Sequence, residues 1–178
     1  MISVYTDTSK IDKQYMSRSA VNGLRRAVAE SELDPSHCVF RSVSRLSRTI
    51  TTLFDKEFAP VDLTAGHFTI LMTLFRAGAL SVGGLAELLD MDASTIPRVL
   101  QPLLRGKLVT SKSGTDRRYR ILSITEEGCV RLNIALPYWQ RIQKRVQTQM
   151  RSTSWTAARQ ALGTLRESAI QLQRRDAK

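Results

Sequence analysis

The sequence predicts a mainly α-helical fold that carries one small β-hairpin. Apolar residues recur at spacings of three and four over most of the 178 residues, as they do along the buried face of a helix. After Gly106 this spacing changes to two, on either side of the turn sequence SGTD, which is typical of paired strands. A chain of this length can bury one sizeable core but is too short for two large domains.

The first part of the chain predicts a polar extension followed by a long helix. Residues 1–35 are polar and hold one weak helical pattern, so we expect a short helix within an N-terminal extension. From about 37 to 58 a regular apolar stripe predicts a helix that Pro60 ends. The stripe consists of Val39, Val43, Leu46, Ile50 and Leu53. A stripe this regular should be buried against another helix.

Three shorter helices are expected between residues 64 and 106. Thr64 and Gly78 cap the first helix, and Ser81 caps the second. Asp92 or Ser94 caps the third, and the sequence DMD before it forms a turn between crossing helices. The residues expected to face the core are Phe68, Leu71, Leu74 and Phe75 in the first helix and Leu85, Leu88 and Leu89 in the second.

Two strands and two further helices complete the chain. The strand positions taken to share a face are Val109 and Ser111, then Tyr119, Ile121 and either Ser123 or Ile124. Thr125 caps a helix that continues to about residue 150 and bends near Pro137. The sequence STSW begins a last helix with alanine and leucine along one face.

The charge of the chain indicates a polyanionic partner. Its 27 Lys and Arg residues exceed its 16 Asp and Glu residues, which leaves a formal net charge of +11. Between residues 94 and 122 only Asp116 is acidic. The cations of that stretch are Arg98, Arg105, Lys107, Lys112, Arg117, Arg118 and Arg120. No apolar stretch is long enough to cross a bilayer or resembles a signal peptide, so we expect a cytoplasmic protein without a membrane partner.

The order of these elements predicts a winged helix-turn-helix. Its second helix enters the major groove of DNA, and its ribbon, or wing, reaches along the backbone, where cations neutralise phosphates. Helical spacing predicts base contacts from Ser94, Thr95, Arg98 and Gln101, and the ribbon contributes Lys112, Arg117 and Arg118. For the two hydroxyls the alternatives remain open: Ser94 caps the helix, and Thr95 touches only phosphate.

Residues 63–128 resemble the core of the MarR family of transcriptional regulators. Several separated signatures occur in the family's order: SV..LAE.L.M, ST..R.L..L...G.LV, DRR and a threonine-x-x-glycine helix start. With the flanking helices the resemblance covers about residues 36–172. It implies a homodimer that binds a pseudo-palindromic operator as a repressor, with an acid, here Asp116, bracing the wing. Pro97 departs from the family, which usually has a donor side chain there.

The resemblance also divides the chain into regions. Residues 1–35 form an extension, residues 36–60 and 126–175 form a helical dimerisation layer, and residues 61–125 form the winged helix-turn-helix DNA-binding domain. The long apolar faces outside the winged helix support dimerisation independently, because a small winged helix cannot cover them alone.

Two kinds of effector are compatible with the resemblance. A small aromatic or phenolic molecule would bind between the dimer layer and the winged helix, near Phe40, His67, Tyr138 and Trp139, although each of these also suits the core. Alternatively, Cys38 lies where an oxidation-sensing branch, that of the organic-hydroperoxide repressors, keeps its reactive cysteine, and a helix N-terminus stabilises a thiolate. Phe54 stands where that branch has a tyrosine, which weakens the second alternative.

Other classes of protein fit the sequence poorly. An enzyme would need His37 to activate Cys38, but neighbours on a helix point about 100° apart. Two cysteines and two histidines give no structural zinc spacing, so we expect no metal and no cofactor. An adaptor for RNA or a membrane surface is a remote alternative, because aromatic residues make up only 6% of the chain and single-strand binding relies on stacking.

Overall fold

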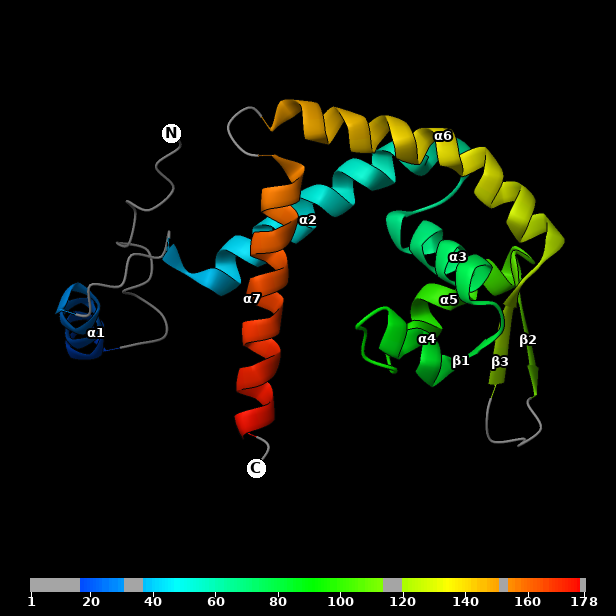
Figure 1. Ribbon diagram of the computed structural model, residues 1–178. Helices are drawn as coiled ribbons and strands as arrows, with labels where there is room; N and C mark the ends of the chain where they lie inside the picture. Colours follow the sequence, from blue (N-terminus) through cyan, green and yellow to red (C-terminus); the bar gives the residue numbers. More distant parts are fainter. Residues whose placement is uncertain (1–16, 31–36, 114–119, 151–153, 177–178) are drawn as a thin grey trace. The chain divides into compact units, whose positions relative to one another are not determined.

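The computed structural model describes residues 17–30, 37–113, 120–150 and 154–176. The chain divides into two compact units, Met1–Thr49 and Ile50–Lys178, and the boundary falls inside the second helix. Most described residues are helical and one small antiparallel sheet is present, which confirms the predicted fold class (Figure 1).

The first unit holds α1 (Arg18–Glu30) and the first half of α2 (Val39–Phe58). α2 confirms the predicted long helix. In the single chain, however, the first three residues of its stripe are exposed: Val39 by 58%, Val43 by 41% and Leu46 by 47%. α1 likewise has no buried residue. The predicted stripe is therefore present but largely uncovered within one chain.

The second unit begins with the end of α2 and the short 3-10 helix η3 (Ala59–Val61). The helices that follow are α3 (Ala65–Ala77), α4 (Val82–Leu88), α5 (Ile96–Arg105), α6 (Glu126–Gln149) and α7 (Trp155–Asp176). The strands are β1 (Leu80–Ser81), β2 (Val109–Ser113) and β3 (Arg120–Ile124), in the order β1-β3-β2. β1 was not predicted, because a strand of two residues has no periodicity.

Side chains at the predicted positions begin three of these helices. The hydroxyl of Thr64 accepts a hydrogen bond from the backbone N–H of His67 at 3.2 Å, and Ser81 and Thr125 do the same for Gly84 and Gly128, each at 3.0 Å. Gly78 ends α3 with a φ of 79°, as expected for a glycine after a helix. Local capping chemistry was thus read correctly from the sequence.

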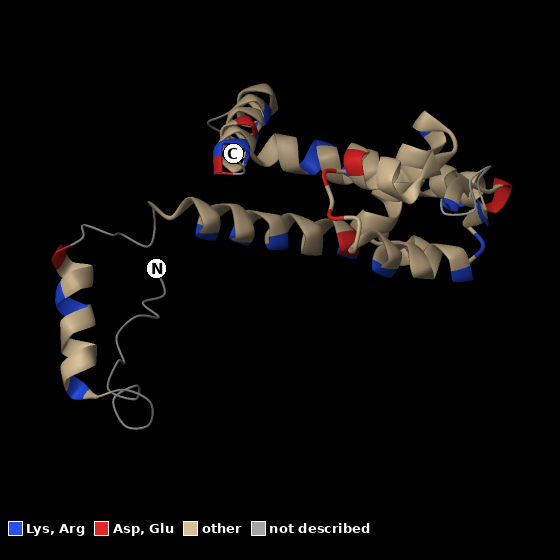
Figure 2. Cartoon of the chain, turned by 90° about the horizontal axis from the view of Figure 1, so that it is seen from below, with Lys and Arg blue, Asp and Glu red and all other residues tan. Residues whose placement is uncertain are grey.

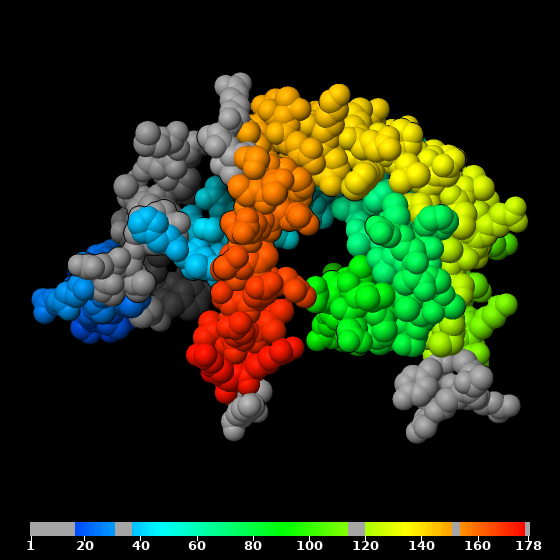
Figure 3. Space-filling view, viewed as in Figure 1, coloured from blue at the N-terminus to red at the C-terminus, as the bar shows by residue number. Residues whose placement is uncertain are grey.

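The core lies between α3, α5, α6 and the sheet, and it corrects parts of the predicted core. Phe75 is 59% exposed and Leu88 is 56% exposed, whereas Ile70 is 1% exposed. α3 contacts α5 and β3 as well as α6, so its covered face is wider and turned toward Ile70. Figure 3 shows the yellow atoms of α6 lying directly on the green atoms of the winged-helix region.

The phase of the second strand also differs from the prediction. Leu122 is the buried residue of β3, at 1% exposed, and its face includes Arg120 and Ile124. The predicted face, through Ile121 and Ser123, is the opposite one. A shift of one residue in a strand moves every side chain to the other side of the sheet.

Candidate nucleic-acid interface

α5 has an apolar inner face and a polar outer face. Ile96, Leu100 and Leu103 are at most 4% exposed and pack in the core. Arg98, Gln101 and Arg105, which are three and four residues apart, are all exposed. Residues at this spacing share one side of a helix. The structure therefore places the predicted Arg98 and Gln101 together on the outer face of α5, and it adds Arg105, which was not among the predicted contacts.

The start of α5 differs from the prediction. The helix begins at Ile96, with Thr95 as its N-cap residue, so Ser94 lies just outside it. The N–H of Ser94 donates to Oδ1 of Asp92 at 2.7 Å and forms a local turn. Hydrogen bonding from Ser94, its side chain first and then its backbone, lowers the pKa of Asp92. The capping role expected of Ser94 is therefore wrong, while its hydroxyl and that of Thr95 lie at the exposed entrance to α5.

The late start of α5 makes Pro97 easy to accommodate. Pro97 lies in the first turn, where a backbone N–H would have no partner inside the helix. Pro102 lies inside α5, yet the helix continues to Arg105. The outer face of α5 is thus carried by a helix that holds two prolines.

The register of the hairpin separates its cations. Ser111 pairs with Leu122, Lys112 with Ile121 and Ser113 with Arg120. Paired residues share a face and neighbours alternate. Arg120 is therefore on the face of the buried Leu122, toward α5, whereas Lys112 is on the opposite face. Sequence reasoning omitted Arg120, because the phase assigned to β3 was off by one residue.

The predicted contacts at the wing tip, Arg117 and Arg118, and the bracing Asp116 lie outside the described residues, so their roles remain predictions. Within the described chain, basic residues occur on both sides of the hairpin tip and along the helices (Figure 2).

Comparison with known proteins connects this geometry to a family. Residues 63–119 match the MarR family model. The HTH-type transcriptional repressor YetL of Bacillus subtilis is 32% identical over 102 residues, which is 56% of this chain and 61% of that protein. These matches place the chain in the MarR family.

Solved structures of MarR-family and related regulators share the fold. The Mycobacterium tuberculosis transcriptional regulator MosR, solved with DNA, has a TM-score of 0.70 and 24% identity over 76% of this chain and 98% of its own. BpsR of Bordetella bronchiseptica has a TM-score of 0.65 and 20% identity over 77% of this chain and 96% of its own. The chain spans 61% of the length of YetL and of a second Bacillus subtilis relative, YybA.

Acidic residues at the end of α2 fasten this MarR-type winged helix to neighbouring helices. Oδ1 of Asp55 accepts from the N–H of Ala65, the first residue of α3, at 2.7 Å. Glu57, whose side chain is only 10% exposed, forms ion pairs with Arg141 and Arg145 of α6. The end of α2 thus contacts both the start of the winged helix and the middle of α6.

The predicted effector-site residues have structural roles in the chain. Nδ1 of His67 accepts from the N–H of Thr64 at 3.3 Å and completes the cap of α3. Burial lowers the pKa of His67, against the opposing effects of Asp55 and Asp62. Trp139 stacks on Phe68, with ring centroids 6.2 Å apart.

The other two predicted residues occupy different surroundings. Tyr138 is partly buried, and the guanidinium carbon of Arg141 lies 4.8 Å from the centre of its ring. Phe40 belongs to the first compact unit and is 80% exposed. A ligand-binding role for these two residues, and for His67 and Trp139, remains a prediction.

A hollow of about 640 Å³ lies between the end of α2 and the second half of α6. Ile50 and Leu53 of the α2 stripe line it, together with Ile142 and Val146 of α6. The remaining lining residues are mostly polar or cationic: Arg141, Lys144, Arg145, Thr148, Gln149 and Met150. The apolar stripe of α2 therefore continues into an open apolar hollow.

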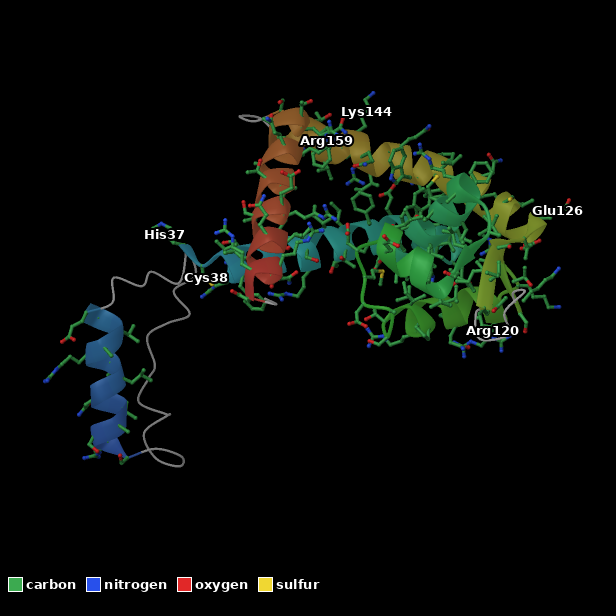
Figure 4. The ribbon with its side chains drawn as sticks, turned by 60° about the horizontal axis from the view of Figure 1, so that its bottom comes forward. His37, Cys38, Arg120, Glu126, Lys144 and Arg159 are labelled. Atoms are coloured by element: carbon green, nitrogen blue, oxygen red, sulfur yellow. The ribbon has the colours of Figure 1, made fainter. Side chains whose placement is uncertain are left out.

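Cys38 is exposed and immediately precedes α2. Its carbonyl accepts from the N–H of Ser42 at 3.0 Å, so Cys38 occupies the N-cap position of the helix. His37 is its sequence neighbour at the start of the helix (Figure 4). Cys129 is a half-buried free cysteine in α6.

Searches for metal and membrane features gave limited findings. Among the described residues, no group of three or more His, Cys, Asp and Glu side chains is arranged to hold a metal ion. In the same part of the chain, no single helix has the length and apolar character to cross a membrane, but the pair Val39–Val61 and Ala65–Ala77, bent by 75°, passes that test jointly.

Proposed function

We propose that two copies of this MarR-family chain form a dimer that binds a specific sequence of duplex DNA and represses transcription. One observation carries the proposal: α5 buries its apolar face in a winged-helix core and presents Arg98, Gln101 and Arg105 outward. A helix in this position of a winged helix reads the major groove. The similarity to the repressor YetL supports the regulatory role, which would place the protein in the cytoplasm.

Uncovered apolar faces support the dimer. In the single chain α2 exposes its stripe, and α7 exposes Leu162 by 42%, Leu165 by 37% and Leu172 by 60%. Faces of this kind on long helices are covered in stable proteins by a second surface. We assign that surface to the same helices of a second copy, which would also close the hollow between α2 and α6.

The roles in DNA binding follow from this arrangement. Arg98 and Gln101 would reach base edges, with Ser94 and Thr95 at the entrance to the helix. Arg117 and Arg118 would enter the minor groove at the wing tip, with Asp116 as their brace, and Lys112 would contact the backbone. Two-fold symmetry sets the half-sites about 34 Å apart, one turn of the duplex.

Release of the operator by a small aromatic molecule is our proposed regulation. The structure of the neighbour BpsR is described as explaining regulation of its DNA binding by 6-hydroxynicotinic acid. In this chain the aromatic residues between the end of α2, α3 and α6 provide a suitable surface, with His67, Tyr138 and Trp139 at its edge.

Oxidation of Cys38 is the second candidate regulation. The observation that favours it is the exposed thiol at the N-cap of a helix of 20 residues. The helix dipole favours the thiolate there, which is the form that peroxides attack.

Selection of bound sites from a random duplex library tests the proposed function. We expect the selected sites to share a two-fold symmetric sequence, and the protein to sediment as a dimer. Replacing Arg118 with alanine should weaken binding to all duplexes and reduce the log–log salt slope by about one unit. A monomer, or a protein without preference for any duplex over bulk competitor DNA, would contradict the proposal.

A further inference from the structure

We propose that a cleft between α5 and the base of the wing binds one phosphodiester group of the DNA backbone, with Arg120 as its cation. The inference rests on the proposed DNA binding and adds a site to it. Neither the predicted contacts nor the comparisons assign this site.

The cleft lies between the recognition helix and the hairpin and has a volume of about 400 Å³. Leu100 and Leu104 of α5 and Leu122 of β3 form an apolar floor. Three polar side chains line the same cleft, one from each element around it: Gln101 of α5, Ser111 of β2 and Arg120 of β3. A cation, a hydroxyl and an amide therefore converge on one concave surface.

The chemistry of this surface suits a singly charged oxyanion. None of the described residues that line the cleft is acidic, so the charge of Arg120 is not neutralised within it. The guanidinium group offers several N–H donors in one plane, which match the two free oxygens of a phosphodiester. The hydroxyl of Ser111 and the amide of Gln101 add donors of the kind that contact DNA backbones.

The position of the cleft identifies the source of the phosphate. In a winged helix bound to DNA, the helix occupies the major groove and the ribbon reaches the adjacent backbone and minor groove. The strand that separates these two grooves must then pass between the helix and the ribbon. In this chain that passage is the cleft, so a phosphate of the duplex arrives there whenever α5 lies in the groove.

The register of the hairpin explains why Arg120, rather than Lys112, serves this site. Arg120 shares the face of Leu122, two residues farther along the strand, and is exposed near the end of the hairpin (Figure 4). Lys112 pairs with Ile121 on the other face. A cation on the outer face cannot reach a phosphate held between the hairpin and α5.

A scan of neutral phosphates tests the site directly. The duplex selected by the wild-type protein is remade with one methylphosphonate at each backbone position of a half-site. For the wild type we expect one position, between the major-groove and minor-groove contacts, where neutralisation weakens binding about tenfold. The Arg120→Ala variant should bind the unmodified duplex about tenfold more weakly and should be insensitive to neutralisation at that same position. Its log–log salt slope should be lower by about 0.9 for each phosphate lost.

Matched variants separate the site from general effects of charge. Arg120→Lys keeps the charge without the planar fork and should retain sensitivity at the same phosphate, with weaker binding than the wild type. Arg159→Ala removes an exposed arginine of α7 and should leave affinity and the scan unchanged. Inorganic phosphate at constant ionic strength should not compete with the duplex.

The outcomes that overturn the inference are distinct from a failure of the proposed function. If Arg120→Ala keeps the wild-type sensitivity at every methylphosphonate position, or if inorganic phosphate displaces the duplex at constant ionic strength, the cleft does not hold the backbone. If the wild type selects no duplex at all, the proposed DNA binding itself fails. Circular dichroism of the variants confirms that a loss of binding reflects the removed side chain and not unfolding.

Discussion

Asp55, in the last turn of α2, accepts a hydrogen bond from the backbone N–H of Ala65, the first residue of α3, over 2.7 Å. The first N–H groups of a helix have no partner inside it, and an acidic side chain there also interacts favourably with the helix dipole. Asp55 therefore joins the long helix to the first helix of the winged helix-turn-helix region through a tertiary cap.

Replacing Asp55 with alanine should reduce the free energy of unfolding by about 1 kcal/mol, as the loss of a helix cap does. Asp55→Asn keeps an acceptor oxygen and should lose less. Lys56→Ala, at the exposed neighbouring position, is the control and should have little effect. Urea unfolding at fixed protein concentration measures all three, and equal stability of Asp55→Ala and the wild type would show that the cap contributes nothing.

His67 makes stability depend on pH. Burial lowers its pKa below the ordinary 6.5, so the unfolded chain binds a proton more readily than the folded chain. The contribution of the neutral ring is therefore complete above 6.5 and is lost as the pH falls below that value. Protonation also removes the acceptor Nδ1 from the cap of Thr64.

The variant His67→Gln isolates this effect, because glutamine accepts the same capping hydrogen bond without titrating. Between about pH 8 and pH 5.5, where few other side chains titrate, the wild type should lose stability and His67→Gln should lose less. His37→Gln, at the other histidine, should keep the wild-type slope. Identical slopes for the wild type and His67→Gln would rule out a contribution from His67.

Gly128 is required by a close approach of α6 to the chain before β2. A Cβ at this position would lie 2.1 Å from the carbonyl oxygen of Leu108 and 2.7 Å from Cγ1 of Ile124. The backbone of Leu108 cannot move freely, because its carbonyl also accepts from the N–H of Thr125 at 3.1 Å. Gly128→Ala should therefore destabilise the fold by about 3 kcal/mol, as overpacking does.

Gly83→Ala provides the matched control for thermal unfolding. Gly83 lies in α4, and a Cβ there would contact only Oγ of Ser81 at an ordinary 3.9 Å. The added helix propensity should raise stability by up to about 1 kcal/mol. Opposite signs for the two alanine substitutions are expected, and a tolerated Gly128→Ala would show that α6 does not lie against Leu108 as described.

Arg98 should read a base. Arg98→Ala is expected to reduce discrimination at one base pair of each half-site by about 1–3 kcal/mol, while other positions keep their preference. Binding to a panel of single-base variants of the selected duplex measures this. Arg105→Ala, on the same face near the end of α5, serves for comparison. A uniform loss across the panel would instead assign Arg98 to a phosphate.

Cys38 should be dispensable for DNA binding and necessary for any response to peroxide. Oxidation of its thiolate by a hydroperoxide gives a sulfenic acid and adds a polar oxygen at the start of α2. Cys38→Ser should bind the selected duplex normally but remain bound after mild peroxide treatment. Cys129→Ser should respond like the wild type. Retention of the duplex by the oxidised wild type would remove this candidate and favour the small-molecule effector.

Much of this fold could be predicted because its signals are local. Thr64, Ser81 and Thr125 begin their helices through hydrogen bonds that span three residues, and Gly78 ends α3 through its own backbone conformation. The 3.6-residue period of α2 and the outer face of α5 are also properties of a single helix. A local signal needs no knowledge of what packs against it.

Contacts between distant segments could not be predicted in the same way. The sequence predicts an alternating strand after the turn, but only the pairing of Ser111 with Leu122 decides which side of β3 is buried. That pairing places Arg120 toward α5, and the cap from Asp55 to Ala65 likewise depends on how α2 meets α3.

The sequence by itself determined the helices, the hairpin, the excess of positive charge and the family resemblance, since each follows from neighbouring residues or from the order of motifs. Only the tertiary structure decided the late start of α5, the added strand β1, the phase of β3 and the cleft that Arg120 lines. The physical reason is that the free energies of several alternative local arrangements are close, and packing between segments far apart in the chain selects one of them.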